Sequence, residues 1–186
     1  MKNLSKLLGG IALIIVMVSA VAETKSVVFQ SLPMTLEGFK SLPQASMKTP
    51  YETAAMFVVA LNAYQQNMDE SIAMINFLKG PEPLSPREIN LIREQLTSYN
   101  YLPRSYFEGA TAKNDYTPSK PYKVVVSDNA YSYATEGTAR LLVKCGGADS
   151  PRPITMRQAK DGKWYLWEHT SLLVGIRVPE SSNPWK

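Results

Sequence analysis

Cys145 and His169 are the side chains best suited to nucleophilic chemistry, because each is the only residue of its type in the chain. A thiol enzyme would need the imidazole beside the sulfur, where it stabilises the thiolate. Strand-like alternation argues against this arrangement, since Cys145 shares a face with Ala139, Leu141 and Val143. We therefore interpret Cys145 as a small buried residue and assign no catalytic residue.

Other catalytic signatures do not occur in the chain. One histidine and one cysteine give no cluster of soft metal ligands, and neither H-E-x-x-H, G-x-S-x-G nor a glycine-rich phosphate loop is present. We expect no metal and no cofactor. Two carboxylates from distant positions could still form a glycosidase site, so a hydrolase remains the alternative.

The most unusual loop is Gly146–Pro153, which combines two glycines with Asp149, Ser150 and Arg152. Proline on both sides restricts Arg152, so the loop could present a guanidinium to an anion or a carbohydrate. The structural interpretation is a strand connector that Asp149 or Arg152 pins to the body of the protein. Both interpretations are kept, and the three polar residues are candidate binding residues.

A second candidate surface comes from the strand-like second half of the chain. Lys123, Arg140, Lys144 and Arg157 alternate with apolar positions, so they would share one face of a sheet. Basic groups beside aromatic rings can bind an anionic glycan or a protein partner. The alternative is an ordinary solvated face. The aromatic residues of this region are Tyr131, Tyr133, Tyr165 and Trp167.

Three main helices are expected before residue 109. Thr49 and Glu52 form a capping box for a helix from Pro50 to about Gln66, which is apolar almost all round and so should be buried. Asn67 or Asp69 can cap a second helix, which Gly80 stops. The remaining expected helices are a capped, amphipathic one from Ser85 to about Asn100 and a short one near 35–40.

Beyond residue 109 the pattern is that of an antiparallel meander. Asp161-Gly162 predicts a two-residue hairpin turn between strands. Helices followed by strands indicate an α+β fold, with the helices packed on one face of a curved C-terminal sheet of about five strands. The expected strands are 122–127, 131–135, 138–145, 154–159 and 163–170, with a further strand near 27–30.

The first 22 residues have the pattern of a secretory signal peptide. Lys2 and Lys6 precede an apolar run, and Ala20 and Ala22 occupy the small-residue positions of a cleavage site. The run is shorter than the roughly 20 residues that span a bilayer, so an N-terminal membrane anchor is the lesser alternative. We expect an exported protein, periplasmic or secreted, with no stable membrane anchor after cleavage.

Chain length and composition indicate one domain after the predicted signal peptide. Residues 23–48 are interpreted as an N-terminal extension, and 49–186 as a single α+β domain. The single cysteine cannot form an internal disulfide, so packing must stabilise the fold. The formal net charge of +4, which includes Lys2 and Lys6, is too small to indicate a nucleic-acid partner.

Five sequence motifs lie at 76–81 (NFLKGP), 102–111 (LPRSYFEGAT), 116–122 (YTPSKPY), 146–153 (GGADSPRP) and 164–168 (WYLWE). Together they resemble those of an uncharacterised bacterial family, a domain of unknown function. The resemblance implies no activity, cofactor or catalytic residue.

From the residues themselves, the leading hypothesis is a non-catalytic exported module that binds an envelope component or a protein partner. The alternative is a hydrolase that acts on a cell-envelope polymer.

The predicted signal peptide leads to a testable prediction about cleavage. Export should be accompanied by cleavage after Ala22, because signal peptidase reads the small residues Ala20 and Ala22. The intact mass of the exported protein should then correspond to residues 23–186. A membrane-bound species that retains residues 1–22 would contradict this expectation.

Overall fold

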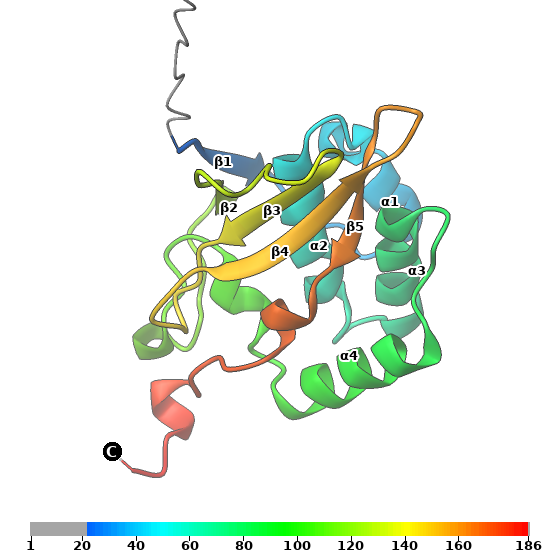
Figure 1. Cartoon of the computed structure of the whole chain (residues 1–186). Coiled ribbons are helices and arrows are strands. Elements are labelled where there is room, and N and C mark those ends of the chain that lie inside the picture. Colours follow the sequence, from blue (N-terminus) through cyan, green and yellow to red (C-terminus); the bar gives the residue numbers. More distant parts are fainter. Residues whose placement is uncertain (1–21, 186) are drawn as a thin grey trace, which may run out of the picture.

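Five antiparallel strands form one open sheet in the computed structural model, which describes residues 22–185 (Figure 1). Their order in the sheet follows their order in the chain, and the helices are inserted between β1 and β2. The α+β fold expected from the sequence is confirmed, with the four later strands in the C-terminal half. The strands are β1 (Thr24–Phe29), β2 (Tyr122–Ser127), β3 (Thr138–Val143), β4 (Arg152–Gln158) and β5 (Trp164–Glu168).

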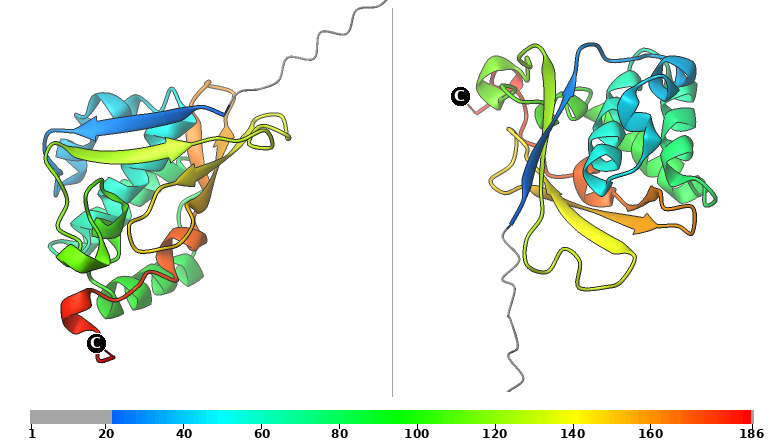
Figure 2. Two further views of the ribbon diagram at one scale, coloured as in Figure 1. Left: turned by 90° about the vertical axis from the view of Figure 1, so that its left-hand side faces the viewer. Right: turned by 90° about the horizontal axis from the view of Figure 1, so that it is seen from above.

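Four α-helices lie together on one face of the sheet, and no α-helix of residues 22–185 covers the other face (Figure 2). The three main helices begin where the sequence predicts, because Thr49, Asn67 and Ser85 each accept a hydrogen bond from a first-turn N–H. The helices are α1 (Leu36–Lys40), α2 (Pro50–Ala63), α3 (Met68–Lys79) and α4 (Pro86–Ser98). Short 3-10 turns cover Pro43–Ser46, Pro103–Tyr106, Ala112–Asn114, Thr170–Leu173 and Glu180–Ser182.

The two expected capping boxes differ. Ser85 and Glu88 form the complete reciprocal box, in which the Glu88 carboxylate accepts the Ser85 N–H at 2.7 Å. At the start of α2 the Glu52 carboxylate accepts a hydrogen bond from the Thr49 hydroxyl at 2.9 Å. The Thr49 side chain also accepts the Glu52 N–H at 3.3 Å, but Glu52 does not bond back to the Thr49 backbone. The box that starts α2 is therefore only half formed.

Helix α2 is the centre of the core. All of its residues except Glu52 and Asn62 are buried, and it contacts every strand of the sheet. Its polar positions are satisfied by neighbours: the Thr53 hydroxyl donates to the Trp164 carbonyl at 2.8 Å, and the Ala60 carbonyl accepts from the Ser71 hydroxyl at 2.7 Å. The prediction of a buried central helix is confirmed.

The segment 23–48, interpreted as an extension, supplies part of the fold. Strand β1 pairs with β2 from Thr24↔Ser127 to Phe29↔Tyr122, and Phe39 of α1 is fully buried. The sequence predicted a strand near 27–30 and a short helix near 35–40, but not their place in the domain, because the partner strand of β1 lies far along the chain. The domain therefore begins at β1.

The strand expected at 131–135 does not form. Turns occupy this segment, in which Asn129 Oδ1 accepts from the Tyr131 N–H at 2.8 Å and Ser132 Oγ accepts from the Asn129 N–H at 2.9 Å. These local bonds compete with a sheet ladder. The tyrosine–serine–tyrosine alternation thus belongs to a compact loop between β2 and β3.

The β4–β5 hairpin is longer than expected. Ala159 and Lys163 close it through an N–H to carbonyl bond of 2.9 Å, so three residues make the turn. Gly162 takes a φ of 79°, which is the left-handed position of a three-residue hairpin loop. Glycine is required here, and the two-residue turn expected at Asp161-Gly162 is corrected.

The expected signal peptide lies almost entirely outside the described residues. From residue 22 to residue 185, no helix has the length and apolar character needed to cross a membrane.

Candidate functional site

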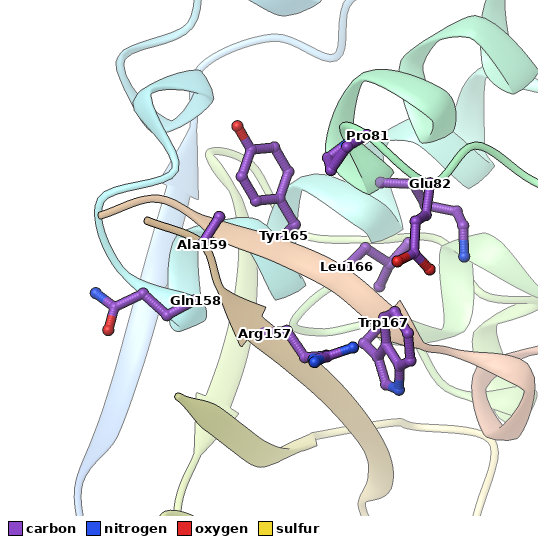
Figure 3. A pocket seen from close by; sticks show the side chains of 9 residues that line it. Pro81, Glu82, Arg157, Gln158, Ala159, Tyr165, Leu166 and Trp167 are labelled. Atoms are coloured by element: carbon purple, nitrogen blue, oxygen red, sulfur yellow. The ribbon is translucent and has the colours of Figure 1, made fainter. Parts of the chain in front are cut away.

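The candidate site is a small hollow between β5, the end of β4 and the loop after α3, which we call the β5 hollow (Figure 3). Its volume is about 190 Å³, and it is open to solvent on one side. Two of the residues predicted from the sequence, Arg157 and Trp167, lie on its wall. The lining residues are Lys79, Pro81, Glu82, Arg157, Gln158, Ala159, Tyr165, Leu166 and Trp167.

Arg157 and Trp167 form a cation–π pair. The guanidinium carbon lies 4.2 Å from the centroid of the indole ring, and 42% of Trp167 remains exposed. A β-bulge produces this contact: Met156 pairs with Leu166 and Thr155 with Glu168, so Trp167 has no partner on β4. Bulges re-aim a side chain in this way. Arg157 has no ion-pair partner among residues 22–185.

Gly80 brings the helix layer to the hollow. It ends α3 with a φ of 62°, and a Cβ at this position would lie 2.3 Å from the Tyr165 ring. Only glycine allows such a close approach together with this backbone conformation. The result is that Lys79, Pro81 and Glu82 face β5. Sequence reasoning missed these three residues, although the glycine-proline stop after α3 was a signal.

Lys79 is buried beside the hollow and is paired. Its ammonium lies 3.0 Å from the Glu88 carboxylate at the start of α4. Burial opposes ionisation of Glu88, but hydrogen bonds from Ser85 and the pairing with Lys79 outweigh it and lower the Glu88 pKa to about 2. The Glu88 carboxylate therefore stays ionised near neutral pH.

His169 lies just beyond β5 and is 1% exposed. Its ring packs edge-on against Phe57 of α2 at a centroid distance of 5.0 Å, and neither ring nitrogen has a hydrogen-bond partner among the described residues. Burial, assisted by the positive charge of Lys79, lowers the His169 pKa to about 4. The imidazole is therefore neutral at pH 7.

Cys145 contacts Ser105 and Gly147. Its sulfur lies 3.3 Å from the Ser105 hydroxyl and accepts the Gly147 N–H at 3.4 Å. The residue is buried, as alternation predicts. Within residues 22–185 the Cys145 sulfur and the His169 ring nitrogens form no hydrogen bond with each other.

The loop Gly146–Pro153 is bound to the C-terminal segment. Arg152 donates to the Val174 carbonyl at 3.1 Å and to the Gly175 carbonyl at 2.5 Å. Asp149 forms an ion pair with Arg177, whereas Ser150 is exposed. These contacts are those of a loop pinned to the body of the protein, which was the structural interpretation.

The predicted binding residues do not gather in one place. Arg140 is exposed on β3 and lines a second hollow of about 410 Å³, which we call the Tyr131 hollow. Lys144 is exposed after β3 and lies beside the segment 105–111. Within residues 22–185 no group of three or more histidine, cysteine, aspartate or glutamate side chains could hold a metal ion.

Taken together, the molecule is an α+β domain with a small aromatic and basic hollow at one edge of its sheet. The chain belongs to the family described as "Domain of unknown function (DUF6935)", whose model matches residues 31–180. The resemblance to an uncharacterised domain family is thus confirmed, and all five motifs fall within the matched range. No curated protein and no solved structure matches the chain.

The Arg152 contacts generate a stability prediction. Replacing Arg152 by alanine removes two hydrogen bonds to the C-terminal segment, so the free energy of unfolding should fall by about 1 to 3 kcal/mol. Urea melts of the wild type and Arg152→Ala measure the difference. The matched control is Arg87→Ala on the exposed surface of α4, which should change stability by less than about 0.5 kcal/mol. Equal melts for both variants would contradict the pinned loop.

His169 generates a prediction about pH. Its folded pKa of about 4 lies below the ordinary value of 6.5, so the unfolded state binds the proton more readily. Stability should therefore be fully present above pH 6.5 and should be lost as the pH falls towards 4, by about 3 kcal/mol from this group. His169→Phe, which keeps a ring against Phe57, should lack this loss. Denaturant melts at pH 7 and pH 4 test it, and equal pH dependence of the two proteins would contradict it.

Proposed function

We propose that the protein is a non-catalytic binding module of the cell envelope, and that the β5 hollow holds a group of an anionic envelope component. One observation carries the proposal: the Arg157 guanidinium lies over the half-exposed Trp167 ring at the wall of this hollow. The cation has no ion-pair partner within the described chain. It is therefore free to bind an anion from outside.

The chemistry of the hollow suits an acidic sugar. An indole ring offers an apolar surface to the apolar face of a sugar ring, and a guanidinium can bind a carboxylate through two hydrogen bonds. Tyr165 and Pro81 add apolar surface, whereas the ammonium of Lys79 is already paired with Glu88. The volume of about 190 Å³ is below the range of roughly 300–1,000 Å³ that encloses a whole small ligand, so it would hold one group of a larger ligand.

The residues present favour binding over hydrolysis. A glycosidase needs two carboxyl groups on either side of the scissile bond. Among the residues that line the β5 hollow, Glu82 is the only carboxylate. His169 nearby is buried and lies outside the lining. The envelope hydrolase remains the alternative function, and turnover of the ligand would favour it.

The envelope is part of the proposal because of the leader. Residues 1–22 have the charged start, apolar run and small-residue end of a signal peptide. The mature protein would then act in the periplasm or outside the cell, where its ligand would be a surface or wall polymer.

Tryptophan substitution tests the proposal. Trp167→Ala should weaken binding of oligogalacturonate, a defined acidic glycan, by about tenfold or more, because an aromatic and arginine pair at the centre of an interface carries much of the binding energy. Titration calorimetry measures the affinity, and a neutral maltooligosaccharide should not bind. The matched control is Trp185→Ala, which alters a tryptophan that is 91% exposed near the C-terminus. Unchanged binding by Trp167→Ala, or no binding by the wild type, would overturn the assignment.

A further inference from the structure

On the face of the sheet that no α-helix covers, the charged side chains of the three middle strands, β2, β3 and β4, are all basic. Alternation places the apolar partners Leu141 and Ile154 inward and the residues between them outward. No acidic side chain occurs among the outward residues of β2, β3 and β4 and the residue that follows β3. These residues are Lys123, Val125, Ser127, Thr138, Arg140, Leu142, Lys144, Pro153, Thr155 and Arg157.

Most of this charge is unpaired. Lys123 forms an ion pair with Glu108 at 3.2 Å, but Arg140, Lys144 and Arg157 have none among residues 22–185. Glu168 of β5, which pairs with Thr155 of β4, accepts hydrogen bonds from the Thr170 N–H at 2.9 Å and the Thr170 hydroxyl at 2.6 Å. An anionic ligand would therefore complement the face.

The two arginines are diagonal neighbours on this face. Arg140 lies opposite Thr155, and Arg157 is two residues further along β4. Such diagonal neighbours lie roughly 7–8 Å apart between their Cα atoms. Thr155 lies on the same face, opposite Arg140. A ligand that crosses from β3 to β5 would meet both guanidinium groups in succession.

Arg140 shares a hollow with an aromatic residue, Tyr131. The Tyr131 hollow of about 410 Å³ is lined by Asn129, Tyr131, Arg140, Leu142 and Pro153, and Tyr131 is 81% exposed. The loop that carries Tyr131 is fixed to β3, because the Ser132 carbonyl accepts the Arg140 N–H at 2.8 Å. The chain thus builds two aromatic and arginine sites, one on each side of β4.

We propose that these two hollows are consecutive subsites for one anionic polysaccharide, which runs across β3, β4 and β5. This inference rests on the proposed function and adds the class of polymer and its path. Two similar subsites on one rigid sheet match a ligand that repeats an acidic ring. Each ring stacks on an aromatic side chain while its acid group binds the neighbouring arginine.

An acidic peptide fits the same charge less well. Peptides that bind sheets usually add a strand at an edge, where backbone groups are free to form hydrogen bonds. The proposed path crosses the strands over their face, where β3 and β4 are paired with each other and offer side chains alone. A peptide backbone would find few partners there, whereas a polysaccharide uses hydroxyl and acid groups.

Chain length provides the test. For the wild type, affinity measured by titration calorimetry should rise at least about tenfold from monogalacturonate to hexagalacturonate, because the second subsite is filled by a linked unit. Arg157→Gln should weaken binding of both ligands. Arg140→Gln should weaken only the hexamer and remove most of the gain with length. Arg87→Gln, an exposed arginine of α4, is the matched control and should change neither. Urea melts confirm that each variant is folded.

The outcomes separate the two proposals. A monomer and hexamer of equal affinity, or an Arg140→Gln variant with wild-type hexamer binding, would overturn the second subsite and leave the β5 hollow in place. No binding of either glycan by the wild type would overturn both proposals. Binding of a polyglutamate peptide as tightly as the hexamer would show that charge alone determines affinity and would overturn the polysaccharide assignment.

Discussion

The packing of α2 against the sheet is the interaction on which the rest of the structure depends. A helix that is apolar almost all round cannot lie at a surface, so strands and helices must enclose it. All five strands contact α2, and α3 adds a contact with β5. The buried Thr53 hydroxyl and Ala60 carbonyl of α2 bond to Trp164 and Ser71 rather than to water. No α-helix of the described chain covers the outer face, where the basic side chains Arg140, Lys144 and Arg157 lie without ion-pair partners.

Much of the fold could be predicted from the sequence, because its signals are local. Hydroxyl or amide caps and proline mark the starts of the main helices, and β2 occupies the predicted residues. The errors arose where local chemistry has two solutions. Residues 131–135 have the alternation of a strand, but the Asn129 and Ser132 side chains accept hydrogen bonds from nearby backbone N–H groups and stabilise a turn instead. The strand predicted near 27–30 does form, as β1, but its pairing with the distant β2 could not be deduced from local sequence.

The candidate site was partly predictable for the same reason. Arg157 and Trp167 follow from strand alternation and a cluster of aromatic residues. Their contact depends on a bulge at Thr155 and Met156, which has no sequence marker of its own. Lys79, Pro81 and Glu82 come from another layer, and only the approach of Gly80 to Tyr165 brings them near. Such tertiary contacts cannot be deduced from spacing along the chain.

The place of β1 in the sheet has a consequence for the order of folding. This strand is the first described element of the chain, yet its partner β2 lies at 122–127, so the Glu23 N–H meets the Asp128 carboxylate across 105 residues. Contacts of such high sequence separation raise the contact order and slow folding, because a long loop must close before they form. The helices can form locally during synthesis, whereas the sheet edge must wait for β2. A chain of this topology therefore stays incompletely folded until β2 has been made, which is about two thirds of the way along the chain.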